Sequence, residues 1–257
     1  MNILVDTHAH LEELPDLEES LNSAISAGVE RIIAVGSDQA SNERVLQIAS
    51  KHTGLVYGAL GLHPQNLEAN EVEPTLAFID SHATQVVAIG EIGLDYHKRV
   101  LSAATKDFQK QVLSDLLDIA SRHDKPVLIH SRYAWRDCLT LAEHAGVQKC
   151  VFHWFTGPSS VFRDIVGLGY YLSATPAVEY HEEHRRAVRE APMDRLLLET
   201  DSPVTYQRGS DSEFEARPAD VIRSMAGAAT LKGCSEGEIA ESTTANAGKL
   251  FGFAPEF

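Results

Sequence analysis

The sequence predicts a single α/β barrel of the (β/α)8, TIM-barrel type followed by C-terminal helices. Short runs rich in Val, Ile and Leu alternate with longer segments of helical period, which is typical of βα units around a parallel sheet. The short runs are apolar throughout, as expected for strands covered on both faces. At 257 residues, the chain has a length at which such barrels commonly form one domain, so we expect residues 1–257 to be one domain.

Each element of this barrel can be assigned to a segment. The predicted strands are residues 3–6, 31–35, 56–60, 86–90, 126–129, 150–152, 171–173 and 196–198. The predicted helices are residues 17–27, 42–51, 73–81, 104–123, 135–145, 159–167, 182–190, 220–230 and 235–250. The clearest helix is 104–123, where Phe108, Val112, Leu116 and Ile119 recur at helical spacing. In 182–190, charges of both signs alternate at helical spacing, which predicts an exposed face with intrahelical ion pairs.

A doubly wound open sheet is the alternative architecture. No Gly-x-Gly-x-x-Gly follows the first strand and no Walker loop is present, so the forms of that fold that bind nucleotide cofactors lose support. We therefore expect no organic cofactor. The length and the number of strands favour the closed barrel.

Composition indicates a cytoplasmic protein with no membrane partner. No apolar run approaches the roughly 18 residues of a spanning helix, and the N-terminus lacks a basic segment followed by an apolar core. The three cysteines are widely spaced, which argues against a disulfide framework or a thiolate zinc site. The net charge of −15 repels polyanions at long range, so a nucleic-acid substrate would have to be held locally. No feature indicates an oligomeric state.

Ionisable residues follow six of the eight predicted strands. His8 and His10 end the first strand and project to one side, with Cα atoms roughly 7 Å apart. Functional groups gather at the carboxyl ends of barrel strands. Four of these histidines with two of the carboxylates, and no thiolate, would form a site for Zn²⁺, Mn²⁺ or Mg²⁺, and six ligands suit two ions that share a carboxylate. The residues at the ends of the other five strands are His63, Glu91 with Asp95, His130, His153, and Glu199 with Asp201.

Taken together, these strand-end motifs resemble those of the TatD family of metal-dependent deoxyribonucleases, in the amidohydrolase superfamily. The resemblance spans almost the whole chain and includes a C-terminal helix around residues 243–251. The motifs are Asp6-Thr7-His8-Ala9-His10, Gly61-Leu62-His63-Pro64, Gly90-Glu91-Ile92-Gly93-Leu94-Asp95, His130-Ser131-Arg132, His153-Trp154-Phe155-Thr156-Gly157 and Glu199-Thr200-Asp201-Ser202-Pro203.

The resemblance implies two divalent ions and a phosphodiesterase acting on DNA, commonly as a 3′ to 5′ exonuclease. It implies that Glu91 bridges the ions and that Asp201 is a ligand. We interpret Asp201 as the group that orients or deprotonates the attacking water, because a carboxylate beside an ion stays ionised. The implied ligands are His8, His10 and Asp201 for one ion, His130 and His153 for the other, and Glu91 for both.

Several nearby residues have two interpretations each. His63 is a candidate substrate contact or a hydrogen-bonded turn residue. Arg132 is a candidate phosphate clamp or the partner of a carboxylate in a salt bridge. Glu199 is a candidate acceptor for a ligand histidine. Trp135 and Trp154 are candidates to stack on bases, although packing is expected for Trp135 on its helix.

Two departures from the family pattern lie where substrate is expected. Trp154 stands where members often carry Cys, and Glu215-Ala216-Arg217-Pro218 stands where Arg-Asn-Glu-Pro is common. Neither removes a proposed ligand. One rival interpretation is a two-metal hydrolase of a small ester, lactone or amide, since this fold supports several hydrolyses. Another is a catalytically idle metal-binding protein, which the complete ligand set argues against.

Overall fold

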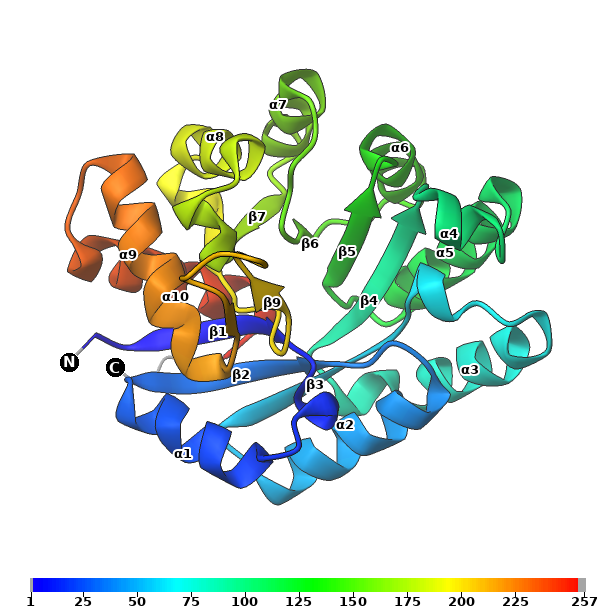
Figure 1. Cartoon of the computed structure of the whole chain (residues 1–257). Helices are drawn as coiled ribbons and strands as arrows, with labels where there is room; N and C mark the ends of the chain where they lie inside the picture. Colours follow the sequence, from blue (N-terminus) through cyan, green and yellow to red (C-terminus); the bar gives the residue numbers. More distant parts are fainter. Residues whose placement is uncertain (1, 254–257) are drawn as a thin grey trace.

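The computed structural model describes residues 2–253 and contains an eight-stranded parallel sheet curled into a barrel (Figure 1). Each strand pairs with the next in chain order. Where β1 meets the segment after β8, the His10 amide donates to the Ser202 carbonyl at 2.8 Å and the Asp201 amide to the His8 carbonyl at 2.9 Å. The predicted (β/α)8 barrel is confirmed. Its strands are β1 Leu4–Ala9, β2 Val29–Val35, β3 Val56–Leu62, β4 Ala88–Asp95, β5 Val127–Arg132, β6 Cys150–Phe152, β7 Tyr171–Ala174 and β8 Leu196–Leu198.

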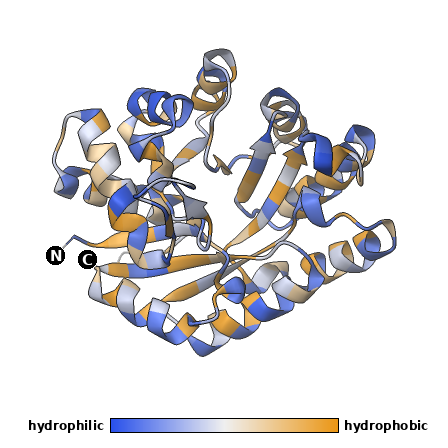
Figure 2. Ribbon diagram, viewed as in Figure 1, coloured by the Kyte–Doolittle hydropathy of each residue, from blue (hydrophilic) through white to orange (hydrophobic). Residues whose placement is uncertain are grey.

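Helices cover the outside of the sheet with their apolar faces turned inward, as the orange strands and mixed helices of Figure 2 show. In α5, Val112, Leu116 and Ile119 are buried, and the Thr105 hydroxyl caps the first turn. Within residues 2–253, none of the helices combines the length and apolar character required to cross a membrane. The helices are α1 Leu17–Ser26, α2 Gln39–Lys51, α3 Ala69–His82, α4 Lys98–Leu101, α5 Lys106–Arg122, α6 Trp135–His144, α7 Ser159–Gly167, α8 Glu182–Glu190, α9 Val221–Lys232 and α10 Glu236–Phe251.

The last helix, α10, closes the amino end of the barrel. Its residues Ala247, Leu250 and Phe251 join the apolar cluster that contains Val5 of β1 and Leu197 of β8. The Thr244 hydroxyl donates to the Ile3 carbonyl, and the Asn246 amide donates to the Leu196 carbonyl. These contacts hold the starts of β1 and β8, so the carboxyl ends of the strands are left for the functional site.

Five strands, β1, β3, β4, β5 and β7, end later than predicted from the sequence. β4 continues to Asp95 and β5 to Arg132, so the polar motif residues lie within the ladder, with Gly93 opposite His130. Ladder hydrogen bonds involve only the backbone, so polar side chains do not end a strand. A Cβ on Gly93 would lie 1.9 Å from the His130 carbonyl oxygen. Glycine therefore lets the two strands approach each other beneath the site.

One prediction for α8 is wrong. His184 is buried rather than part of an exposed face. The Thr175 amide donates to its Nε2 at 3.1 Å, and its Nδ1 lies 3.2 Å from the Phe155 carbonyl oxygen. The neutral ring therefore joins α8 to the segments after β6 and β7. Burial lowers the pKa of His184 from its usual 6.5 to about 4.

This shift predicts a pH-dependent stability. Below pH 6.5 the unfolded chain binds a proton at this histidine, whereas the folded chain binds it only near pH 4 and below. The stabilisation is complete above pH 6.5 and is lost as the pH falls towards 4. We expect His184 to lower the free energy of unfolding of the wild-type chain by about 2 kcal/mol between about pH 7 and about pH 5, and His184→Gln to lack this decrease. Urea unfolding at the two pH values would measure it. The exposed His144→Gln is the control, and an unchanged difference in His184→Gln would contradict the prediction.

Candidate metal centre

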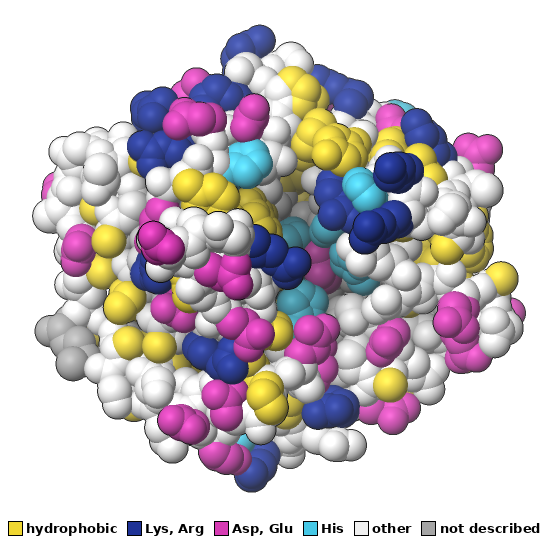
Figure 3. Space-filling model, viewed as in Figure 1, with side chains coloured by type: hydrophobic (Ala, Val, Ile, Leu, Met, Phe, Trp, Pro, Cys, Tyr) yellow, Lys and Arg dark blue, Asp and Glu magenta, His cyan; other side chains and the backbone are white. Residues whose placement is uncertain are grey.

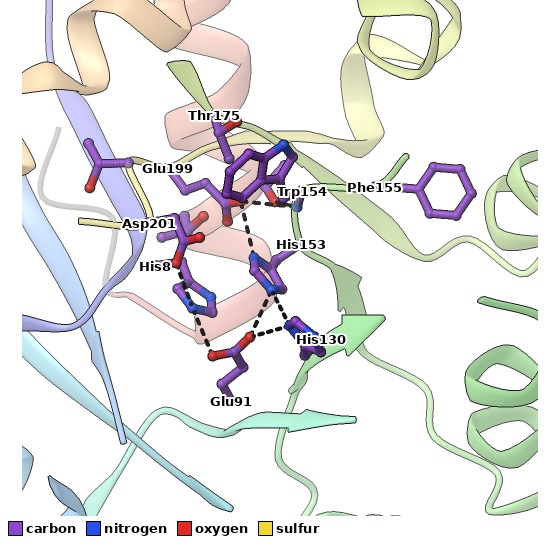
Figure 4. A network of polar contacts seen from close by, with 12 residues as sticks. His8, Glu91, His130, His153, Trp154, Phe155, Thr175, Glu199 and Asp201 are labelled. Atoms are coloured by element: carbon purple, nitrogen blue, oxygen red, sulfur yellow. Dashed lines mark hydrogen bonds and ion pairs between the residues drawn. The ribbon is translucent and has the colours of Figure 1, made fainter. Parts of the chain in front are cut away.

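The carboxylate of Glu91 on β4 lies at the centre of a group of histidines from four other strand ends (Figure 4). Its Oε1 lies 2.8 Å from His153 Nε2 and 2.9 Å from His130 Nδ1. Its Oε2 lies 3.6 Å from His8 Nε2 and 3.5 Å from His10 Nε2. The two oxygens of one carboxylate thus face two different pairs of imidazoles.

Asp201, just after β8, completes the side that contains His8 and His10. Its Oδ1 lies 3.6 Å from the Nε2 atom of each ring. His8 and His10 therefore point to the same side of β1, as their spacing predicts. The residue has a φ of +50°, a left-handed conformation that is uncommon outside glycine and that turns the chain into the site.

The chemistry of these side chains fits divalent cations. Three overlapping groups place their nitrogen and oxygen ligand atoms within 4.8 Å of one another: His8 with His153 and Asp201, His8 with His10 and Glu91, and His63 with Glu91 and His130. Both ring nitrogens of His8 are buried without a hydrogen-bond partner among the described residues. Such orphaned nitrogens are costly unless something satisfies them, and imidazole with carboxylate suits Zn²⁺ or Mn²⁺.

The two inner carboxylates are held ionised. Burial raises the pKa of Glu91, but the neighbouring His153 and the contacts with His10 and His130 outweigh it and leave the pKa well below its usual value. The pKa of Asp201 is likewise lowered, because the nearby imidazoles of His10 and His8 outweigh the effect of burial. Both groups are therefore available to cations as anionic oxygen ligands.

This cluster forms the floor of an open pocket of about 870 Å³. Arg132 and Arg208 line the pocket with His63, Tyr133 and Trp154. Figure 3 shows the hollow with histidine and acidic side chains inside it and Lys or Arg side chains on opposite sides of its rim. The pocket is large enough for a nucleotide-sized ligand.

A sequence model of the TatD related DNase family matches residues 5–252. The chain belongs to the TatD family. It is similar to the human "Deoxyribonuclease TATDN3", with 32% identity over 96% of this chain and 94% of the relative. It is also similar to the Bacillus subtilis "Uncharacterized metal-dependent hydrolase YabD", with 36% identity over 97% of this chain and 99% of the relative. The solved structure of the TatD homologue YJJV from Escherichia coli K12 superposes with a TM-score of 0.85, at 29% identity and 98% coverage of both chains. The predicted family is confirmed, and the chain is a hydrolase of that family.

Three histidines of the metal centre have a second carboxylate near their outer nitrogen, which is the ring nitrogen that faces away from Glu91. His10 Nδ1 lies 3.7 Å from Glu12 Oε1, His130 Nε2 lies 3.5 Å from Asp95 Oδ2, and His153 Nδ1 lies 3.5 Å from Glu199 Oε1. A carboxylate on this side of a ligand histidine orients the ring and raises the basicity of the inner nitrogen when the outer N–H group donates to it. Glu199 is expected in this position from the sequence, whereas the sequence gives Glu12 and Asp95 no such role.

Asp95 also holds Arg132. Its Oδ1 accepts from Arg132 Nε at 3.0 Å and its Oδ2 from Nη2 at 2.6 Å. The Asp95 side chain is fully buried, and Gln109 on α5 accepts from its backbone amide at 2.8 Å. Arg132 therefore forms the salt bridge that one interpretation predicts, and its guanidinium also lines the pocket. The signal was present in the sequence, since Asp95 lies four residues after Glu91 and so on the same face of a strand.

His63 borders the cluster as a donor. The Gln65 amide donates to its Nδ1 at 3.1 Å, so the neutral ring carries its proton on Nε2. That Nε2 lies 3.6 Å from Glu91 Oε1. Burial lowers the pKa of His63 to about 3, which keeps the ring neutral. An N–H group therefore points into the site from β3.

The network around Asp95 predicts that its charge supports metal binding at His130. We expect Asp95→Asn, which keeps the size of the side chain, to weaken Mn²⁺ binding by about tenfold, because the outer acceptor of His130 loses its charge. Isothermal titration calorimetry would measure the affinity. Asp118→Asn, on the exposed face of α5, is the matched control. Unchanged Mn²⁺ affinity in folded Asp95→Asn would exclude this role.

Proposed function

We propose that this TatD-family chain is a two-metal phosphodiesterase that acts on DNA, as a 3′ to 5′ exonuclease. The observation that carries this proposal is the position of Glu91, whose two oxygens face separate pairs of histidines. A carboxylate that bridges two cations requires this arrangement. In the proposal, His8, His10 and Asp201 hold one ion, His130 and His153 hold the other, and Glu91 holds both. The ions are Mg²⁺, Mn²⁺ or Zn²⁺, as the donor set allows.

When bound, such a pair of ions polarises the phosphoryl oxygens and makes water a better nucleophile. The side chains of the chain perform the remaining steps. Asp201, which lies in the site with an ionised carboxylate, orients the attacking water and accepts its proton. His63 donates a hydrogen bond from Nε2 to an oxygen of the reacting phosphate, since its Nδ1 is engaged by Gln65.

Arg132 is the proposed phosphate contact. Its guanidinium carries five N–H donors, of which Asp95 engages Nε and one on Nη2. The remaining donors belong to a side chain that lines the pocket and is 42% exposed. Because Asp95 orients the guanidinium, little side-chain entropy is lost when it binds phosphate.

Local positive charge supports DNA as the substrate despite the net charge of −15. Arg132 and Arg208 line the pocket, and further Lys or Arg side chains lie on its rim (Figure 3). Similar proteins carry the name deoxyribonuclease, among them the human relative. A polyanion could therefore be held at the pocket without attraction to the whole surface, as the composition requires.

The bridging role of Glu91 predicts a change in metal stoichiometry. We expect the wild-type chain, stripped and dialysed against Mn²⁺, to retain two ions, and Glu91→Ala to retain at most one, because neither ion keeps its shared oxygen. Elemental analysis of the dialysed protein would count the ions. Glu73→Ala, an exposed residue on α3, is the control. Two retained ions in Glu91→Ala would rule out the bridge.

The activity itself can be tested on end-labelled DNA. We expect the Mg²⁺- or Mn²⁺-loaded enzyme to release mononucleotides from the 3′ end. Asp201→Asn should lower kcat at least about a hundredfold, since a general base contributes roughly 10²- to 10⁴-fold. Chromogenic phosphodiesters and carboxylic esters would be assayed in parallel. Ester turnover without DNA cleavage would instead favour the hydrolase of a small ester, lactone or amide, and metal binding without turnover would favour the idle scaffold.

A further inference from the structure

Aromatic side chains form part of the pocket wall next to the metal centre. Tyr133, Trp135 and Trp154 line the same pocket as Glu91 and Asp201. Trp135 and Trp154 are the only two tryptophans of the chain. The proposed metal and phosphate chemistry uses none of these three rings, so their place in the wall needs a separate explanation.

Trp154 is fixed from behind by buried groups. Its backbone amide donates to Glu199 Oε1 at 3.1 Å and to Ser173 Oγ at 3.3 Å. Its indole packs on the ring of Tyr206, with the centroids 5.3 Å apart. Tyr206 is buried and its hydroxyl donates to the Thr200 carbonyl at 2.8 Å. Figure 4 shows the indole beside Glu199, on the side of His153 away from Glu91. The result is a rigid aromatic surface at the edge of the metal centre.

Tyr133 is the counterpart of Trp154 at the end of β5. It is 62% exposed, an unusual exposure for so large an aromatic side chain at a pocket. Its ring meets the Trp135 ring edge to face, with the centroids 6.0 Å apart and an angle of 76°. Trp135 in turn packs on Phe155, so it combines the packing role expected from its helix with a place in the pocket wall.

Both aromatic residues are held in a left-handed backbone conformation. Tyr133 has a φ of +59° and Trp154 a φ of +39°. This region is unfavourable for bulky residues and persists where the surrounding structure enforces it, most often at ligand sites. The only other pocket-lining residue that shares it, among the described non-glycine residues, is Asp201. The strain therefore coincides with the site.

We propose that Trp154 and Tyr133 form a subsite for the base of the nucleotide whose phosphate lies at the metal centre. This inference rests on the proposed function. Trp154 directly follows His153, a proposed ligand, and Tyr133 directly follows Arg132, the proposed phosphate contact. One nucleotide could therefore place its phosphate near His153 and Arg132 and its base near Trp154 and Tyr133. Aromatic faces stack on any base, so the subsite requires a base without selecting one.

We expect the base to add to the substrate affinity that the phosphate and the sugar provide, because an indole ring offers a stacking surface to any base. Removal of the base is the most direct perturbation.

Binding can be followed through the protein's own fluorescence, because both tryptophans line the pocket. The probes are 2′-deoxyadenosine 5′-monophosphate and 2-deoxyribose 5-phosphate, each titrated into the Mg²⁺-loaded protein. We expect the nucleotide to bind about 5- to 150-fold more tightly than the base-free sugar phosphate, the range expected of one stacked base. Equal dissociation constants for the two probes would overturn the proposal.

Substitutions at the two rings test whether they cause the preference for the nucleotide over the base-free sugar phosphate. Trp154→Ala, with Trp135 as the remaining reporter, should reduce the preference for the nucleotide to less than about threefold, whereas Trp154→Phe should retain most of it. Tyr133→Ala should weaken the preference without affecting the fold, because the ring is exposed. Tyr180→Ala, an exposed aromatic residue outside the pocket wall, is the control. A full preference in both Trp154→Ala and Tyr133→Ala would place the base elsewhere and refute the subsite.

Hydrolysis separates this proposal from the proposed function. Wild-type enzyme would be given two oligonucleotides that differ only in whether the 3′-terminal nucleotide carries its base. A lower KM for the strand with the base supports the subsite. Hydrolysis of both strands at equal KM would overturn the subsite and leave the phosphodiesterase intact. If neither strand is cleaved but the nucleotide still binds preferentially, the nuclease assignment fails and the base subsite stands.

Discussion

The burial of one carboxylate organises this protein. The Glu91 side chain is 4% exposed, a position in which an isolated negative charge would be strongly disfavoured. Five imidazoles within 3.6 Å of its oxygens provide the compensation. They come from β1, β5 and the segments that follow β1, β3 and β6, so the barrel must bring these strand ends to one point. The apolar interior and α10 supply the rigid frame that makes this convergence possible.

A second layer of carboxylates surrounds the histidines. Glu12, Asp95 and Glu199 lie behind the rings, while Glu91 and Asp201 lie between them. Part of the acidity of the chain is therefore concentrated at one end of the barrel, where cations would offset it. Of the arginines at the pocket, Arg132 pairs with Asp95 at the edge of this acidic centre, and Arg208 lines the wall. In the proposed function, one site would therefore attract metal ions at its floor and a phosphodiester at its entrance.

The sequence predicts the inner residues of this site better than the outer ones. His8, Glu91 and Asp201 are recognisable because each follows an apolar run, and barrel topology brings the ends of such runs together. The role of Asp95 could not be predicted, because β4 continues past the apolar part of its sequence. Glu12 lies in a short 3-10 turn that lacks a strong sequence signal.

Tertiary contacts explain the remaining differences. His184 has the sequence context of an exposed helix, but its burial depends on Thr175 and Phe155, which are distant in the chain. Arg208 lies on a hairpin between β9 Thr205–Tyr206 and β10 Phe214–Glu215, whose strands are too short to give a periodic pattern. Helix ends and strand counts follow from local patterns, whereas the composition of a pocket wall depends on which loops meet above the sheet.

The seam of the barrel has a further consequence. β1 and the segment after β8 are joined at their carboxyl ends by the backbone bonds between His8 and Asp201 and between His10 and Ser202. Three of these four residues also carry side chains proposed to hold one cation. Opening the seam would therefore separate the ligands, and filling the site would hold the seam shut. The bound ion would then stabilise the closed barrel. Each tenfold rise in its concentration above the dissociation constant would add about 1.4 kcal/mol to the free energy of unfolding. The metal content of the surroundings would thus set how stable the fold is as well as how fast the protein reacts.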